Sequence, residues 1–183
     1  LLIARLLGDK GVREYAESAR IIKEKHPEAE FHLVGWIDDN PSAIAQAELD
    51  QWIADGRLKY WGKLTDVRPA IAESSVYVLP SYREGTPRTV LEAMAMGRAV
   101  ITTDAPGCRE TVSHGVNGYL VGVKSVDDLV HSMQYFLEDP KLIEFKGQRS
   151  REIALNKYDV HQVNAHMLRE MGIIDINLES GAC

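Results

Sequence analysis

The sequence predicts an α/β fold, a doubly wound parallel sheet of about six strands with helices on both faces. Short apolar runs rich in β-branched residues recur along the chain, and stretches long enough for helices separate them. Glycine, proline and capping residues mark the boundaries between the two kinds of segment. The expected strands lie at residues 1–4, 31–36, 57–61, 76–79, 99–103 and 119–121.

The expected helices follow from the positions of prolines, glycines and capping side chains. Pro27 ends a first helix at 12–25. Ser125 is a good N-cap for a helix at 126–137, and Pro140 begins another that reaches about residue 155. The other helices are expected at 41–54, at 65–74 with Thr65 as its cap, at 87–96, at 105–114 and at 160–171.

Composition limits the classes of protein to which the chain can belong. Its 183 residues suffice for one sizeable α/β domain. The formal net charge of −6 gives no basis for a nucleic-acid partner. Cys108 and Cys183 show neither metal-ligand spacing nor a disulfide framework, which fits a reduced, cytoplasmic setting. No apolar run approaches the roughly 18 residues that a membrane-spanning helix needs.

Residues 76–104 are the part around which the chain is organised. An apolar strand at 76–79 is followed by a polar turn, a helix that stops at Gly97, and a second apolar strand. Thr86 is the expected N-cap of this helix, and Pro87 its first residue. The turn follows the carboxyl end of a strand, where parallel sheets bind ligands. The helix N-terminus adds unpaired N–H groups and a positive dipole end, which together favour an anion.

Two carboxylates, Glu84 and Glu92, frame this helix N-terminus. Glu92 lies about six residues past the N-cap, which is about 9 Å along the helix axis. A phosphate at the helix end would therefore leave Glu92 within reach of a hydroxyl on the same ligand. The alternative is that Arg88 and Glu92, spaced i,i+4, form only a surface ion pair. The residues alone leave both interpretations open.

The run EGTPRTVLE, from Glu84 to Glu92, resembles the E-x7-E signature of retaining glycosyltransferases of the GT-B fold, specifically glycosyltransferase family 4. The segments 93–97 and 107–110 also resemble that family. The resemblance implies a Rossmann-like, donor-binding second domain over residues 1–172, including a final crossing helix at about 160–171. It also implies that the acceptor-binding N-terminal domain is absent from this fragment. A disordered tail is expected at 173–183.

The resemblance assigns roles to individual residues. The segment that begins at Ala4 resembles the family's G-R-L-x-x-x-K-G run, with Ala4 in place of the first glycine. Arg5 and Lys10 are then expected to contact the donor diphosphate, and Glu84 to face the sugar ring. These three residues are the expected catalytic groups. The expected donor-binding residues are Gly62 and Lys63 at the base, Glu92 at the ribose hydroxyls, and Ser81, Gly85, Thr86 and Pro87 around the helix end.

Two features have an ordinary explanation beside a functional one. Lys63 and Gly62 could simply form a turn that ends a strand. The run Asp38-Asp39-Asn40 offers oxygen ligands for a hard cation, but Asp and Asn before Pro41 are also typical of a turn. No metal site is expected, because the GT-B glycosyltransferases that the sequence resembles do not need one. His161 and His166, five residues apart, are off the i,i+4 spacing of paired metal ligands and are expected on the surface.

The segment from Arg83 to Arg88 is similar to enzymes that build lipid-linked bacterial glycans, such as O-antigen or capsule units. This implies transfer of a sugar, with retention, from a nucleotide donor, expected to be UDP-linked, to a glycan or lipid-linked acceptor. No cofactor is expected. The full-length enzyme would be cytoplasmic and peripheral to the inner face of the membrane. The alternatives are a nucleotide-sugar epimerase of the same two-domain fold and a non-catalytic nucleotide-binding module.

Overall fold

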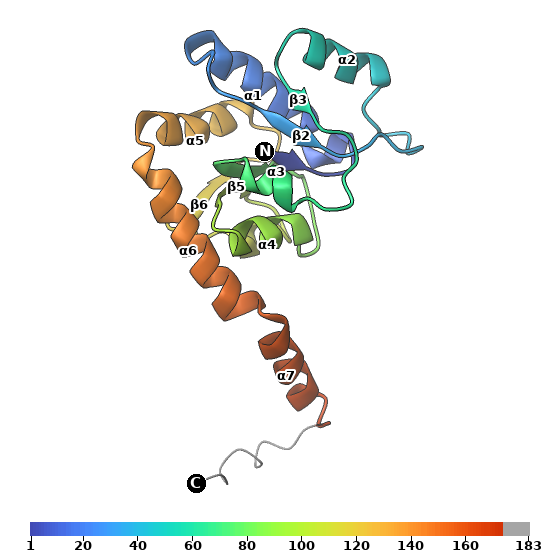
Figure 1. The fold of residues 1–183 in the computed structure, drawn as a ribbon. Coiled ribbons are helices and arrows are strands. Elements are labelled where there is room, and N and C mark those ends of the chain that lie inside the picture. Colours follow the sequence, from blue (N-terminus) through green and yellow to red (C-terminus); the bar gives the residue numbers. More distant parts are fainter. Residues whose placement is uncertain (174–183) are drawn as a thin grey trace.

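The computed structural model describes residues 1–173 and contains two three-stranded parallel sheets with helices packed around them (Figure 1). The first sheet has the order β1-β2-β3 and the second the order β4-β5-β6. Their strands are β1 (Leu2–Ile3), β2 (His32–Val34), β3 (Lys59–Tyr60), β4 (Val76–Leu79), β5 (Ala99–Thr103) and β6 (Gly118–Val121). The parallel pairing has Leu2 opposite Leu33 in the first sheet and Tyr77 opposite Val100 in the second.

The two sheets meet where β1 lies beside β4. The backbone N–H of Val78 donates to the carbonyl oxygen of Leu1 at 2.8 Å, and the amino group of Leu1 donates to the carbonyl oxygen of Val76 at 3.0 Å. Across this junction the strands follow one another as 3-2-1-4-5-6, the order of a doubly wound fold. The predicted fold class is therefore confirmed, and the switch in strand order falls between β1 and β4.

Helices cover both faces of the strands, and each face has its own apolar core. Neighbouring residues of β4 divide between the two cores: Val78 belongs to one, and Tyr77 and Leu79 to the other. This follows from the two-residue side-chain period of a strand. The first core contains side chains of α1 (Val12–Lys25), α2 (Gln46–Ala54) and α5 (Val126–Glu138), and the second those of α3 (Arg68–Ala72), α4 (Arg88–Ala95) and α6 (Lys141–Tyr158).

Several predicted boundaries agree closely with the structure. Helix α1 and strand β4 have the expected bounds, and α5 is one residue longer than expected. The side chain of Ser125 accepts a hydrogen bond from the backbone N–H of Asp128, so the predicted N-cap of α5 is confirmed. Gly97 follows α4 with φ of +71°, in the left-handed region that a helix-ending glycine adopts.

The helix expected at 41–54 is wrong in its first turn, because α2 begins at Gln46. The backbone preceding it pairs with the loop after β1 instead of forming a helix. The N–H of Gly8 donates to the carbonyl oxygen of Ser42 at 2.8 Å, and the N–H of Ile44 donates to that of Leu6 at 2.8 Å. These long-range hydrogen bonds satisfy backbone groups that a helix would otherwise have used.

Two further predictions about helices are wrong. Thr65 does not cap α3, since the carboxylate of Asp66 accepts from the N–H of Arg68 at 3.0 Å and the helix begins at Arg68. The helix expected at 105–114 is a 3-10 turn over Arg109–Thr111. Gly107, with φ of +82°, turns the chain just before it.

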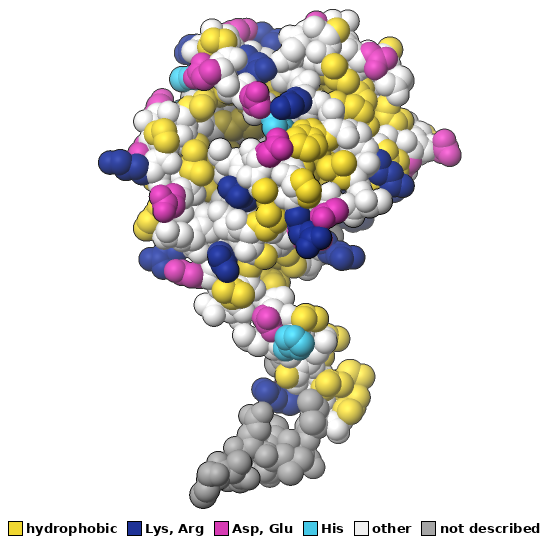
Figure 2. Space-filling model, in the orientation of Figure 1, with side chains coloured by type: hydrophobic (Ala, Val, Ile, Leu, Met, Phe, Trp, Pro, Cys, Tyr) yellow, Lys and Arg dark blue, Asp and Glu magenta, His cyan; other side chains and the backbone are white. Residues whose placement is uncertain are grey.

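The helix α7 (Val160–Glu170) follows α6 and extends away from the rest of the molecule (Figure 1). Figure 2 shows hydrophobic side chains along this extension. Those of Val160, Met167 and Met171 are each more than half exposed. Within residues 1–173, no helix has both the length and the apolar character that crossing a bilayer requires. The predicted tail lies outside the described residues, apart from its first residue.

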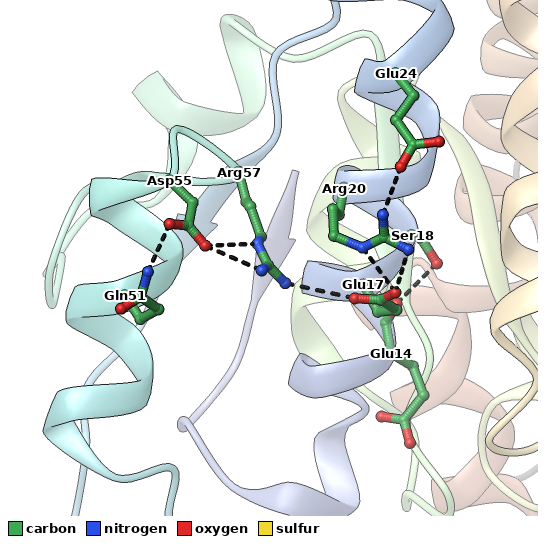
Figure 3. Close-up of polar contacts among 8 residues, drawn as sticks. All are labelled: Glu14, Glu17, Ser18, Arg20, Glu24, Gln51, Asp55 and Arg57. Carbon is green, nitrogen blue, oxygen red and sulfur yellow. Dashed lines mark hydrogen bonds and ion pairs between the residues drawn. The ribbon is translucent and has the colours of Figure 1, made fainter.

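A network of ion pairs joins α1 to the turn between α2 and β3 (Figure 3). Arg20 pairs with Glu17 and Glu24 along α1, and Arg57 reaches both Glu17 and Asp55. Most of these side chains are substantially exposed. Exposed ion pairs contribute little to stability, so we regard this network as surface patterning rather than as a site.

Candidate functional site

A cavity of about 250 Å³ opens at the carboxyl ends of β1 and β4, where the strand order switches. Doubly wound folds bind ligands at this position. The residues that line the cavity come from the carboxyl ends of β1 and β4, the loops that follow these strands, and the start of α4. They are Ile3, Ala4, Arg5, Lys10, Leu79, Glu84, Pro87, Arg88 and Thr89. The structure thus brings together Arg5, Lys10 and Glu84, which the sequence predicts as catalytic groups.

Lys10 and Glu84 form an ion pair inside this cavity. The Nζ atom of Lys10 lies 2.7 Å from Oε1 of Glu84, and the two side chains are 14% and 18% exposed. The residues are 74 positions apart in the sequence, and each comes from a different loop. Because little water reaches the pair, the two charges interact more strongly than a surface pair would. A negative ligand entering the cavity would meet Lys10 already in position.

Arg5 also lines the cavity and is more open to solvent than Lys10. Its Nη1 atom lies 3.1 Å from Oδ2 of Asp38, and the Arg5 side chain is 50% exposed. Asp38 also accepts from the N–H of Asn40 at 2.9 Å, and Asn40 accepts from the N–H of Ser42 at 2.9 Å. The run Asp38-Asp39-Asn40 therefore forms a turn, which was one of the two interpretations of its sequence. Among residues 1–173, no three His, Cys, Asp or Glu side chains gather as a metal site.

The N-terminus of α4 points its first turn at the cavity, without a capping side chain. Pro87 is the N-cap residue, with φ of −73° and ψ of 109°, and no side chain accepts from the first N–H groups. The prediction of Thr86 as N-cap is therefore wrong. Thr86 and Gly85 are exposed in the turn, whereas Pro87 is buried. An uncapped helix end keeps backbone donors and a positive dipole available for an anion.

Glu92 lies one turn further along α4 and is half-buried. It does not line the cavity. The ion pairs of the described part of the chain do not include one between Arg88 and Glu92, so the structure lacks the alternative surface pair. Arg88 instead lines the cavity beside Arg5 and Lys10. The sequence alone pointed to Arg88 only as a partner for Glu92, although its place in the first helical turn is a signal for an anion contact.

Ser81 and Gly107 lie where the loops around the cavity pack against one another. The Ser81 side chain is fully buried and donates within the loops, 3.1 Å from the carbonyl oxygen of Asp9 and 3.2 Å from that of Arg83. Its burial does not support the predicted direct contact with a donor. Gly107 packs so closely that a Cβ there would lie 2.0 Å from the carbonyl oxygen of Glu84.

Gly62 and Lys63 follow β3 and lie outside the lining of the cavity. Gly62 has φ of +71°, and its carbonyl oxygen accepts from the N–H of Gly35 at 2.9 Å. The ammonium of Lys63 lies 4.7 Å from the ring centroid of Trp36, a cation–π contact at the surface. Both residues therefore follow the carboxyl end of β3, at the same edge of the strands as the cavity.

A larger cavity of about 430 Å³ lies at the opposite, amino-terminal edge of the strands. Its lining is mainly apolar and includes Leu1, Phe31 and Val76. None of the predicted site residues lines it. Size alone would favour this cavity, but the charged groups that can act on a ligand converge on the smaller one.

Comparison with known proteins gives a family for this arrangement. The family model of group 1 glycosyl transferases matches residues 1–139. The chain belongs to the group 1 glycosyltransferases. Over 169 residues this glycosyltransferase chain is 39% identical to an N,N'-diacetylbacillosaminyl-diphospho-undecaprenol alpha-1,3-N-acetylgalactosaminyltransferase of Campylobacter jejuni. That match covers 92% of this chain and 43% of the relative.

A second relative is a UDP-Gal:alpha-D-GlcNAc-diphosphoundecaprenol alpha-1,3-galactosyltransferase of Escherichia coli, which is 25% identical over 161 residues. The match covers 87% of this chain and 41% of the relative. The glycosyltransferase chain thus spans less than half the length of these two relatives.

Solved structures share the fold. Alr3699/HepE of Anabaena in complex with UDP matches with a TM-score of 0.83 at 23% identity, over 94% of this chain and 49% of that one. The C-terminal domain of the group 1 glycosyl transferase LpcC from Francisella tularensis matches with a TM-score of 0.75 at 26% identity, over 87% of this chain and 85% of that one. The expected domain fold of a GT-B glycosyltransferase is confirmed.

Proposed function

We propose that this chain is the donor-binding domain of a retaining glycosyltransferase and that its cavity at β1 and β4 binds a nucleoside-diphosphate sugar. The full-length protein would transfer that sugar to a hydroxyl of a lipid-linked glycan. The observation that carries the proposal is the convergence of three cations, one carboxylate and an uncapped helix end on one cavity. Arg5, Lys10, Arg88 and Glu84 line it together with the first turn of α4.

The positive groups suit the charge that develops when the diphosphate departs from the anomeric carbon. Lys10 and Arg88 would bind its oxygens as ammonium and guanidinium donors, and the N–H groups of α4 would add donors that need no reorganisation. Arg5 would exchange Asp38 for the diphosphate, because its pair is exposed and weak. We propose that no metal is needed, since these groups supply the positive charge.

Glu84 would face the sugar and hold its hydroxyls. We propose that retention results from attack by the acceptor on the face that the diphosphate leaves, so that Glu84 forms no covalent bond. Glu92 would accept from the ribose hydroxyls, since it lies five residues beyond Pro87, about 7.5 Å along the helix axis. The base would rest near Gly62 and Lys63, beyond Arg5.

The kinds of donor and acceptor are proposed from the relatives. The relative from Escherichia coli is named for UDP-galactose, and HepE was solved with UDP, which supports a UDP-linked sugar here. Both curated relatives are named for a diphospho-undecaprenol substrate, which supports a lipid-linked acceptor. The full-length protein would then work at the inner face of the cell membrane. An N-terminal domain would supply the acceptor contacts, and the exposed apolar side chains of α7 would pack against it.

Calorimetric titration of the chain with UDP, GDP and ADP, each with and without magnesium, tests the proposal. We expect binding of UDP in preference to the other two, unchanged when magnesium is omitted. Binding of none of them would contradict the donor role, and binding only with magnesium would contradict the metal-free mechanism. Product analysis with the full-length protein then separates sugar transfer from epimerisation, and the anomeric configuration of the product tests retention.

A further inference from the structure

Tyr77 is a buried tyrosine directly behind the donor cavity. It is the second residue of β4, and its side chain is fully buried. Its hydroxyl lies 2.7 Å from Oγ1 of Thr89 and 3.1 Å from the carbonyl oxygen of Ile3. Oγ1 of Thr89 is in turn 3.5 Å from the same carbonyl oxygen. Two hydroxyl groups and one carbonyl thus form a closed triangle between three segments of the chain.

The triangle joins the two parts of the cavity that carry its positive charge. Ile3 ends β1 and is two residues before Arg5, while Thr89 is the second residue of α4. Both Ile3 and Thr89 line the cavity. The hydroxyl of Tyr77 therefore connects the strand that leads to Arg5 with the helix turn whose N–H groups face a ligand.

The hydroxyl of Tyr77 holds the first turn of α4 through the side chain of Thr89 and is not a helix cap. Helix α4 has no side-chain cap, and its N-cap residue Pro87 has no N–H of its own to donate. Tyr77 also remains a neutral donor at physiological pH, because burial raises the pKa of its phenol well above the ordinary value. With one proton on each hydroxyl, one group donates to the other and the second donates to the carbonyl of Ile3.

We infer that the hydroxyl of Tyr77 is a positioning group for diphosphate recognition. It sets the first turn of α4 relative to the strand end before Arg5, so that both meet the same diphosphate. This inference rests on the proposed function, since it concerns how the same cavity recognises its ligand. Electrostatic recognition of this kind depends on donors that are already in place before the ligand arrives.

The test compares UDP with uridine, because the two ligands differ only in the diphosphate. In the unaltered chain, the ratio of the two affinities measures what the diphosphate contributes. Tyr77→Phe removes one oxygen and retains the ring that packs in the core. We expect this ratio to fall about three- to tenfold in Tyr77→Phe, with uridine affinity unchanged, since one buried hydrogen bond is lost.

Tyr15→Phe is the matched control. Tyr15 is as buried as Tyr77, and its hydroxyl donates to a backbone carbonyl, that of His32, at 3.2 Å. It lines the larger cavity at the opposite edge of the strands, away from the donor cavity. We expect Tyr15→Phe to lower the melting temperature about as much as Tyr77→Phe does, while leaving the ratio of UDP to uridine affinity unchanged.

The outcomes distinguish a failure of the proposed diphosphate site from a failure of the positioning role of Tyr77. If the unaltered chain binds UDP no more tightly than uridine, the proposed diphosphate site itself is wrong. If it prefers UDP and Tyr77→Phe keeps the full preference, only the positioning role is wrong. A proportional loss of both ligands in Tyr77→Phe would also overturn the inference, because it would show that the hydroxyl merely stabilises the fold.

Discussion

Replacing Lys10 by methionine should weaken the binding of UDP by about 10- to 100-fold, because a hydrogen bond to a charged group contributes about 1.5–3 kcal/mol. Methionine keeps an unbranched apolar side chain, shorter by one atom, and removes the charge. The Lys10 side chain is only 14% exposed, so solvent does little to screen its interaction with a ligand. Titration calorimetry with UDP at fixed ionic strength measures the change directly.

The same substitution should also destabilise the chain. It leaves the carboxylate of Glu84, 18% exposed, without the ammonium that lies 2.7 Å away. An unpaired polar group of this burial costs about 1–3 kcal/mol. For a domain of this size the melting temperature should fall by several degrees.

Glu84→Gln breaks the charge pair from its other side and should have the opposite effect on UDP. The amide oxygen can still accept from Lys10, while the negative charge that opposes a diphosphate is gone. UDP should therefore bind at least as tightly as to the unaltered chain. Sugar transfer by the full-length protein should fall, because Glu84 would no longer hold the sugar as a carboxylate.

Lys59→Met is the control for the methionine substitution. Lys59 also pairs with a carboxylate, that of Glu30 at 3.8 Å, but its side chain is 58% exposed and lies outside the cavity. We expect unchanged UDP affinity. The reasoning would be refuted if Lys10→Met bound UDP normally, or if Lys10→Met and Glu84→Gln weakened UDP binding equally, as a purely structural ion pair would.

Three further predictions follow from local geometry. Gly107→Ala should lower sugar transfer by the full-length protein on the order of 10- to 100-fold, because the Cβ of the alanine would lie 2.0 Å from the carbonyl oxygen of Glu84. Gly56→Ala is the control, since Gly56 also has a positive φ, +68°, but open space around it, and it should leave transfer unchanged. A hydrogen bond from the guanidinium of Arg68 lowers the pKa of Asp66 from its ordinary value of 3.8 to about 2. The ionised Asp66 carboxylate therefore stabilises the fold above pH 3.8, and this contribution is lost as the pH falls through about 2. The gap in melting temperature between the unaltered chain and Asp66→Asn should therefore narrow between pH 4 and pH 2. Burial raises the pKa of the Cys108 thiol, so peptide mapping should show much slower alkylation of Cys108 in the native chain than in denaturant.

Local signals predicted the elements whose ends are decided by neighbouring residues. Ser125 caps α5 and Gly97 follows α4 because both act through backbone groups within a few residues. Predictions from the same kind of local signal were wrong where backbone groups far away in the sequence form competing hydrogen bonds. The segment before α2 pairs with the loop after β1 through Ser42 and Gly8, and no local pattern records that contact. The helix predicted at 105–114 was wrong for a similar reason, because Gly107 fits closely against the carbonyl oxygen of Glu84.

The sequence by itself determined the family, the α/β alternation and the residue types of the candidate site, because motif spacing and hydrophobic period are local properties of the chain. Only the tertiary structure decided which of those residues meet. Folding brings Lys10 to Glu84 across 74 positions and places Arg88 on the cavity, whereas it buries Ser81 within the loops. It also connects Tyr77 with Thr89 and Ile3. These contacts depend on where β1 and β4 lie in the strand order, and the pairing of strands far apart in sequence is a property of the whole packed sheet.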